Sequence, residues 1–211
     1  MNEMSRTIDI YRLSFLYTIT TSVVMVPFIL YLCIYSTEIF LPIVGTVTLF
    51  LLYIPRIVYM STIWLKYIPQ HTFGIMEMII TTIHILNMLG GIGLYRVFSY
   101  YDMIVHILSP IGVGVVLSLV IASIQKMRGY FHIRTVQQWA ICITIALLFI
   151  WELFEYMGDR VFGTDMFGQI GEQLDTVYDI GLGVVAMILV YLINLFYLEY
   201  MIYESKTTEC K

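Results

Sequence analysis

Long uncharged apolar runs alternate along the chain with short clusters of Pro, Gly and charged residues. The first run, 13–35, contains 23 residues without a charge. A secretory signal has a shorter apolar region of roughly 7–15 residues before a cleavage site, so we expect this segment to remain as a membrane anchor. The runs that follow approach the roughly 20 residues needed to cross a bilayer. They cover 73–95, 103–124, 136–157 and 177–200.

A shorter apolar run, 39–53, lies between the first run and the others and ends near Pro55 and Arg56. It either crosses the bilayer with little tilt or continues to Met60. The next stretch, 57–69, combines aromatic and basic side chains, which is typical of a helix that lies at the membrane interface. This short run is the second of the six predicted spans.

The composition excludes an ordinary soluble protein. Apolar residue types make up 60% of the chain and charged residues 12%, and mean hydropathy is +0.86. Ordinary globular domains contain about 45–50% apolar residues and about 25% charged residues. The net charge of −4 argues against a nucleic-acid partner, and the three cysteines form no disulfide or zinc pattern. The sequence therefore predicts an all-α, polytopic transmembrane bundle of six helices in a single domain, 1–211, with the lipid bilayer as its partner.

The distribution of Lys and Arg predicts the orientation. Basic residues favour the cytoplasmic side of a membrane protein. With six spans and a cytoplasmic N-terminus, nine basic residues face the cytoplasm and only Arg96 and Arg160 face outward. Both termini are then cytoplasmic, and we expect a prokaryotic cytoplasmic membrane. The inner residues are Arg6, Arg12, Arg56, Lys66, Lys126, Arg128, Arg134, Lys206 and Lys211.

Ionisable side chains within the spans point to a functional site. A carboxylate at the centre of a span costs about 2.5–3.5 kcal/mol on insertion scales and is a functional hypothesis by default. In the predicted orientation, three spans carry polar pairs at their outer ends, with His84 beneath them. Glu77 lies nearer the inner side, where we expect a solvated or first-turn residue. The outer pairs are Asp102 with His106, Glu152 with Glu155, and Asp175 with Asp179.

Five carboxylates in one place cannot all stay ionised without a cation, shared protons or access to water. Imidazole beside carboxylates suits Zn, Mn or Fe. We therefore expect a divalent metal with Glu155 or His84 as general base or orienting group. Two simpler interpretations remain, since Asp102 and Asp175 can cap their helices and His84 can bond a backbone carbonyl. The expected metal ligands are Asp102, His106, Glu152, Asp175 and Asp179.

The segment 158–172 is the other informative stretch. It contains four glycines and several acidic residues between two spans. Loops of this length are often functional, so it is expected to cover the polar cluster, unless it is simply a tight re-entry into the last span.

The polar motifs resemble a known family. They occur in the order His84, Tyr101-Asp102-x-x-x-His106, Trp151-Glu152-x-x-Glu155 and Gly171-x-x-x-Asp175-Thr176-x-x-Asp179. This order is similar to the YjdF-type family of small prokaryotic inner-membrane proteins and, more distantly, to the VanZ-like superfamily. The resemblance covers about 73–190. This chain departs from the family's pattern directly after the Asp-x-x-x-His motif, where it has Ile107 to Pro110. The family has no established activity, so the resemblance implies a fold and a site.

Three functions are compatible with these observations. The leading hypothesis is a metal-binding membrane protein that hydrolyses or transfers a lipid- or isoprenoid-linked group. A proton- or cation-coupled transporter would use the same carboxylates to exchange ions. A structural membrane subunit would use the polar helix ends to bind another chain. A transporter needs polar groups at both faces, and Glu77 is the candidate for the inner half.

Overall fold

The computed structural model describes residues 3–35, 40–62, 68–98, 100–162 and 175–203, and the regular elements in this part of the chain are all helices. Five of these helices are long and apolar enough to cross a membrane. They are α1 (Glu3–Tyr35), α4 (Gln70–Leu89), α6 (Tyr101–Met127), α7 (Ile133–Phe162) and α8 (Asp175–Tyr203).

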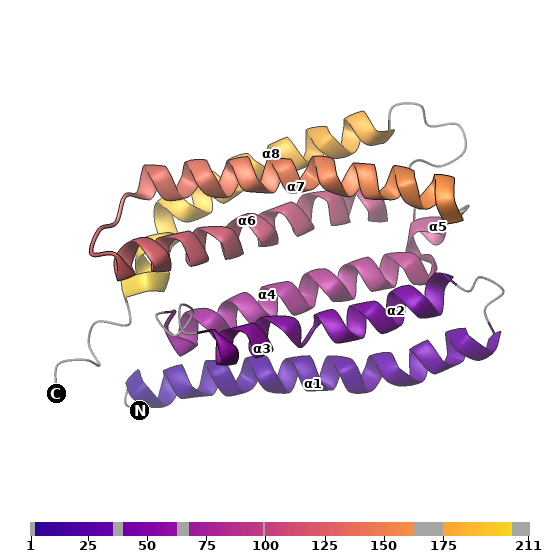
Figure 1. Ribbon diagram of the computed structural model, residues 1–211, viewed down its shortest axis with the longest axis horizontal. Helices are drawn as coiled ribbons and strands as arrows, with labels where there is room; N and C mark the ends of the chain where they lie inside the picture. Colours follow the sequence, from indigo (N-terminus) through magenta and orange to yellow (C-terminus); the bar gives the residue numbers. More distant parts are fainter. Residues whose placement is uncertain (1–2, 36–39, 63–67, 99, 163–174, 204–211) are drawn as a thin grey trace.

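The second pass is built from two shorter helices. These are α2 (Phe40–Leu51) and α3 (Ile54–Ser61), which follow one another along the bundle (Figure 1). Pro55 stands in the first turn of α3, where its missing N–H is tolerated, whereas inside one continuous helix it would break the hydrogen-bond ladder. Residues 57–61 thus continue the second pass, as the longer of the two sequence interpretations expects, and do not begin a separate interfacial helix.

The six passes run alternately in opposite directions (Figure 1). We call the end that holds the start of α1 the near end, and the opposite end, where α6 and α8 begin, the far end. The last turn of α8 also lies at the near end. The structure confirms the predicted all-α bundle of six passes.

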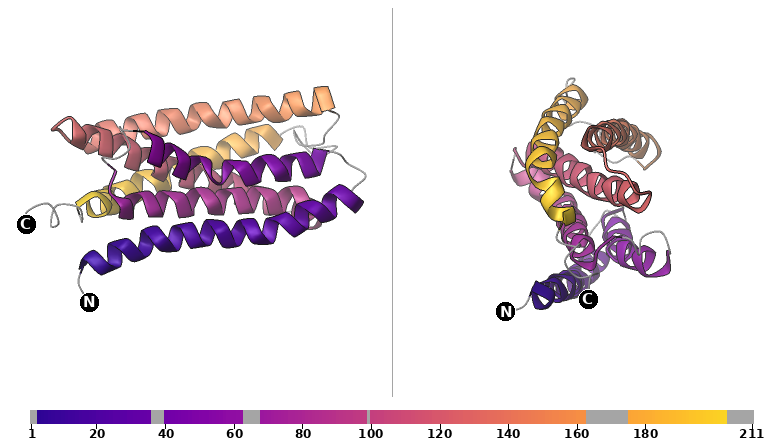
Figure 2. Two further views of the ribbon diagram at one scale, coloured as in Figure 1. Left: turned by 60° about the horizontal axis from the view of Figure 1, so that its bottom comes forward. Right: turned by 90° about the vertical axis from the view of Figure 1, so that its left-hand side faces the viewer.

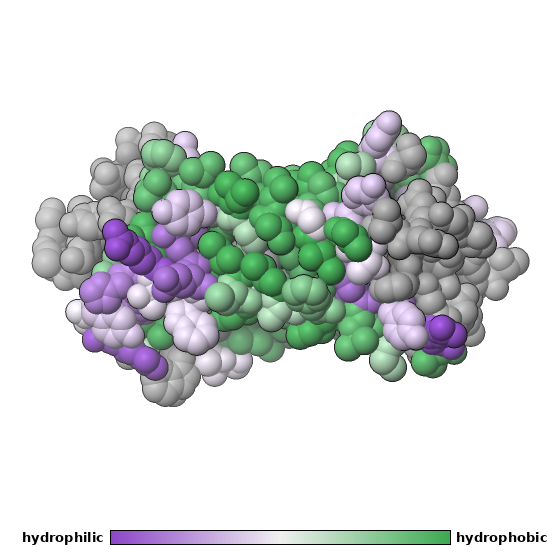
Figure 3. Space-filling model, turned by 90° about the horizontal axis from the view of Figure 1, so that it is seen from above, coloured by the Kyte–Doolittle hydropathy of each residue, from purple (hydrophilic) through white to green (hydrophobic). Residues whose placement is uncertain are grey.

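The sides of the molecule are apolar. Large hydrophobic side chains with more than half of their surface exposed occur on α1, α7 and α8. Among the described residues of α4 and α6 there are none, because these two helices pack between the other long helices. Figure 3 shows a hydrophobic waist between polar groups at the two ends. Because lipid is the solvent that such a waist requires, the fold is that of a multi-pass membrane protein.

Helices α4 and α6 join the two halves of the bundle. In the packing order α1 contacts α4, α4 contacts α6, and α6 contacts both α7 and α8. The end-on view in Figure 2 accordingly places α1 at the opposite edge from α7 and α8. Close approach depends on glycine, since a Cβ at Gly112 would press on Ile79 and Ile83 of α4. Small residues serve this purpose in membrane helix interfaces.

Glu77 is buried, which corrects the expectation of a solvated residue. Its side chain has no exposed surface and forms an ion pair with Arg56 of α3. The two Arg56–Glu77 hydrogen bonds measure 2.7 Å from Nε to Oε1 and 2.5 Å from Nη2 to Oε2. Ser14 of α1 donates to the same carboxylate at 2.6 Å. The Arg56 guanidinium also lies 4.4 Å from the ring centres of Tyr11 and Phe15. The ion pair therefore ties three helices together.

This ion pair predicts a strong asymmetry between single and double substitutions. Glu77→Gln alone leaves the Arg56 charge buried without its partner, which costs about 3–5 kcal/mol. Combining it with Arg56→Met removes both charges and should recover much of that loss. Thermal unfolding in detergent, with Thr82→Val as an exposed control on α4, tests this. Equal melting temperatures for the Glu77→Gln variant and the unaltered protein would contradict a buried pair.

Candidate metal centre at the far end

Three helices bring five ionisable side chains together at the far end. They are Asp102 and His106 of α6, Glu152 and Glu155 of α7, and Asp179 of α8, which we call the carboxylate–histidine cluster. All are buried except Asp102, whose side chain is 31% exposed. The spacings i, i+3 and i, i+4 place each pair on one face of its helix. The sequence predicted this convergence from helix direction and spacing.

His106 lies at the centre of the cluster. Its Nε2 is 3.5 Å from Oδ1 of Asp102, and its Nδ1 is 3.7 Å from Oδ1 of Asp179. It also belongs to a second group with Glu152 and Glu155. In each group, one ligand atom per residue lies within 4.8 Å of the others. The imidazole ring therefore stands between carboxylates from three helices.

Either of these separations suits a cation that is shared by His106 and one of the two aspartates. Direct N–H···O hydrogen bonds measure about 2.7–3.2 Å, shorter than both His106 distances. Two ligands of one tetrahedral ion, each about 2.1 Å from it, lie about 3.4 Å apart. A neutral imidazole binds a metal through one nitrogen and donates its other N–H to a carboxylate, which fixes the ring. The donor set of one imidazole and several carboxylates thus fits Zn, Mn or Fe.

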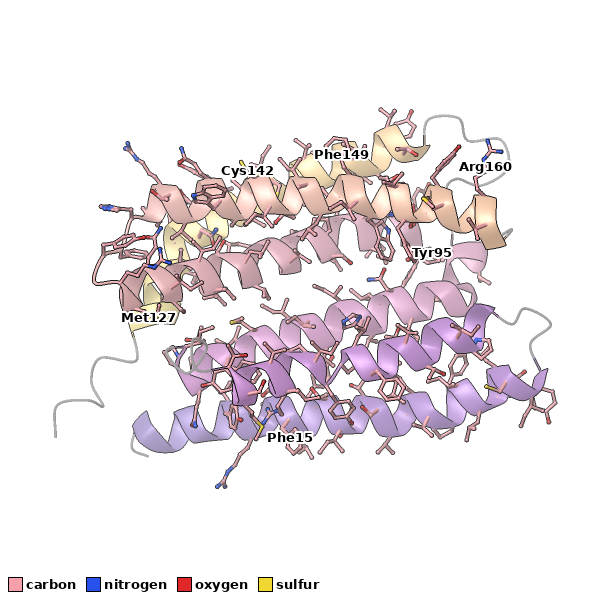
Figure 4. All side chains as sticks on the ribbon, in the orientation of Figure 1. Phe15, Tyr95, Met127, Cys142, Phe149 and Arg160 are labelled. Carbon is pink, nitrogen blue, oxygen red and sulfur yellow. The ribbon has the colours of Figure 1, made fainter. Side chains whose placement is uncertain are left out.

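Arg160 is the basic residue of the far end whose side chain the structure describes, and it lies outside the cluster. Arg160, in the last turn of α7, is exposed, and its guanidinium lies 5.5 Å from the centre of the Tyr156 ring. Figure 4 shows the labelled Arg160 at the outer edge of the bundle. Four carboxylates around one imidazole can be compensated by shared protons, by basic side chains or by a bound cation.

The other predicted site features have different outcomes. Tyr100 is the N-cap residue of α6, so Asp102 lies in the first turn and faces His106, and the capping interpretation is wrong. The Asp175 side chain and the loop 163–174 lie outside the described part of the chain. His84 is half-buried on α4 and is in neither metal-capable group of the described residues. Its role as a base or orienting group stays a prediction.

Tyr95 is a further residue of the far end that no sequence motif singled out. In Figure 4 this side chain lies at the far end, between α4 and the α6–α7 pair. Its ring makes an edge-to-face contact with Tyr101 at 5.4 Å, and the Tyr101 hydroxyl donates to the Leu86 carbonyl at 2.8 Å. Burial, reinforced by the charges of nearby cluster carboxylates, raises the pKa of the Tyr95 hydroxyl. Tyr95 is therefore a protonated donor beside the cluster.

A turn of π-helix places Tyr95 in this position. The turn, η2 (Gly90–Leu94), follows α4 and leads into α5 (Tyr95–Val97). A Cβ at Gly90 would collide with the Tyr95 ring, whereas one at Gly91 would meet no atom within 4 Å. π-turns inside helices often mark functional sites. The glycines of 90–93 were a signal for this turn, since glycine inside a helical pattern indicates close packing or irregular backbone.

Comparison with known proteins places the chain in a family. A family model described as "Predicted membrane protein (DUF2238)" matches residues 16–200, which include Tyr95 and the whole carboxylate–histidine cluster. No curated protein and no solved structure matches the chain significantly. Because the matched segment covers most of the 211 residues, the chain belongs to the DUF2238 family of membrane proteins.

Proposed function

We propose that the carboxylate–histidine cluster binds one divalent transition-metal ion, and that the protein uses it to hydrolyse or transfer a lipid-linked group. The observation that carries this proposal is the position of His106 between buried carboxylates from three helices. Expensive buried charges in a membrane protein are retained where they serve a function. The YjdF-type resemblance, which rests on the same motifs, agrees with a site at this position.

The two aspartates of the cluster face opposite nitrogens of the His106 ring. One ring nitrogen binds the metal, and the carboxylate facing the other nitrogen accepts its N–H. Glu152 and whichever of Asp102 and Asp179 faces the metal-binding nitrogen hold the ion, and the other aspartate orients the ring, with Asp175 expected beside them. Loading the site with a divalent ion offsets half of the charge of four ionised carboxylates. This compensation is the electrostatic reason for binding.

The chemistry follows from the donor groups. The bound metal would act as a Lewis acid on a phosphoryl or carbonyl oxygen of the substrate. Glu155, a buried member of the cluster, accepts a proton from the attacking hydroxyl group or water, and returns it to the leaving oxygen as the bond between that oxygen and the transferred group breaks. The Tyr95 hydroxyl, beside the cluster carboxylates, donates a hydrogen bond to one of the ligand carboxylates. The ligands, the base and the donor are distributed over α5, α6, α7 and α8, so the packing of the far end sets their geometry.

A lipid- or isoprenoid-linked substrate fits the location. The cluster lies about one to two turns inside the ends of apolar helices, near the level where a lipid headgroup meets its chains. The transporter alternative needs an ionisable group available in the near half. Glu77, the candidate for that role, is neutralised by Arg56. This pairing favours the enzyme over the transporter.

The proposed orientation puts the near end in the cytoplasm of a prokaryotic cell and the cluster toward the outside. Reporter fusions at Gln125 and Lys206 should therefore read cytoplasmic, and a fusion at Gly163 should read external. The reason is the excess of basic residues in the segments that lead to the near end. A cytoplasmic signal at Gly163 would contradict this orientation and put the cluster on the cytoplasmic side.

Metal analysis tests the ligand assignment. The purified protein should retain about one equivalent of Zn, Mn or Fe after washing, because a multidentate site releases its ion slowly. Combining His106→Ala with Asp179→Ala should abolish retention. His132→Ala, an exposed histidine at the near end, is the matched control and should retain the metal. Metal-free protein that folds normally and gains no thermal stability from added Zn²⁺ or Mn²⁺ would refute the metal site.

Two neighbouring glycines test the role of Tyr95. Gly90→Ala should displace the Tyr95 ring, and Tyr95→Phe should remove only its hydroxyl. Both changes should weaken metal affinity about 10–100-fold, as is typical for residues that support the ligands. Gly91→Ala, which meets no neighbour, should leave affinity unchanged. The measurement is a metal titration followed by thermal stability. Equal affinity in the two glycine variants would separate Tyr95 from the site.

A further inference from the structure

Two adjoining cavities lie at the near end, on the opposite side of the membrane from the carboxylate–histidine cluster. The first has a volume of about 390 Å³, within the range of about 300–1,000 Å³ typical of ligand pockets. Its walls are both polar and apolar, and Tyr11, Tyr59 and Gln70 contribute to them. The second has a volume of about 200 Å³ and almost purely apolar walls. Ile68 borders both cavities.

The apolar cavity is a groove between α3, α4 and α6. Its walls include Val58 of α3, Phe73, Met76 and Ile80 of α4, and Val120 of α6. Val58 is 40% exposed, so the groove opens toward the side of the bundle. Ile54 and Pro55, at the start of α3 just after the break from α2, also line the groove.

The order of the cavities along α4 follows the polarity of a lipid leaflet. Gln70 lies at the near end of α4 and borders the polar cavity. Ile80, in the apolar groove, is ten residues further along the helix, which is about 15 Å deeper at 1.5 Å per residue. The polar cavity therefore lies at headgroup level and the groove at the level of acyl chains.

Tyr59 joins the two levels. Its ring stacks on Phe73 with the ring centres 4.0 Å apart, and its hydroxyl donates to the Ile68 carbonyl at 2.9 Å. Tyrosine is enriched at this boundary in membrane proteins because one end of its side chain is apolar and the other polar. The stacked pair thus marks the level where headgroup and chain of a lipid would meet.

We propose that this pair of cavities binds one phospholipid, with its headgroup in the polar cavity and one acyl chain in the apolar groove. The occupant is a lipid because the groove opens into the hydrophobic belt, where acyl chains are the solvent. The bound chain packs against α3, α4 and α6 and fills the space beside the broken second pass. This site is independent of the proposed metal chemistry, since it shares no residue with the cluster.

A pair of adjacent tryptophan substitutions tests the proposal. Val58→Trp fills the groove, whereas Ile57→Trp adds the same side chain at a neighbouring position that is 60% exposed and does not border it. Each protein is placed in vesicles of phosphatidylethanolamine and phosphatidylglycerol that contain phosphatidylethanolamine with a photoreactive acyl chain. We expect crosslinks to the groove residues Met76 or Ile80 in the unaltered protein and in Ile57→Trp, and an about tenfold loss in Val58→Trp.

Native mass spectrometry gives an independent measurement. After purification in mild detergent, the unaltered protein and Ile57→Trp should each retain one phospholipid, and Val58→Trp should retain none. Met76→Trp, which fills the groove from α4, is a second variant in case Val58→Trp fails to fold. Retention of lipid by every folded groove variant, or crosslinks spread evenly over lipid-facing residues, would overturn the proposal. Both readouts are independent of metal content.

Discussion

Hydrocarbon offers a charge neither water nor counter-ions, and the structure meets this constraint differently at its two ends. At the near end, Arg56 and Glu77 neutralise each other, and Ser14 together with two aromatic rings completes their surroundings. At the far end, acidic groups gather around one imidazole with no described cation among them. In the first arrangement two opposite charges form one buried pair. In the second, several carboxylates lie close together, a setting in which protons or a metal ion can compensate their charge.

Sequence patterns predicted the passes because each depends on a local property, the length of an apolar run. Residues 57–61 belong to α3 and do not form the interfacial helix that the sequence predicted for 57–69. There the chain turns at Pro55 and continues along α4, with Arg56 facing inward. Arg56 and Glu77 are on different helices, and their pairing also depends on α1, so no local spacing reveals it. Glu77 was therefore placed at the correct end of the bundle but in the wrong environment.

The far end was more predictable because its pairs obey helical spacing. Asp102 with His106, and Glu152 with Glu155, share a face within one helix, and antiparallel passes then bring the pairs to one end. Helical spacing did not identify Tyr95 because this residue follows a π-turn, which changes the direction in which the side chains after the turn point relative to those of α4. The glycine run that permits the turn is visible in the sequence, but its consequence depends on the contact between Gly90 and the Tyr95 ring.

The same physical difference explains why the two ends suit different ligands. At the near end the two charges of the ion pair neutralise each other. Beside the pair lie stacked aromatic rings and an apolar groove, in which an acyl chain can pack through dispersion forces. At the far end several carboxylates gather around one imidazole, and a multivalent cation can compensate their charge with the fewest groups. Helices α4 and α6 join the two halves through their packed interface. The carboxylate–histidine cluster draws its residues from α6, α7 and α8, so its geometry depends on the same helix packing.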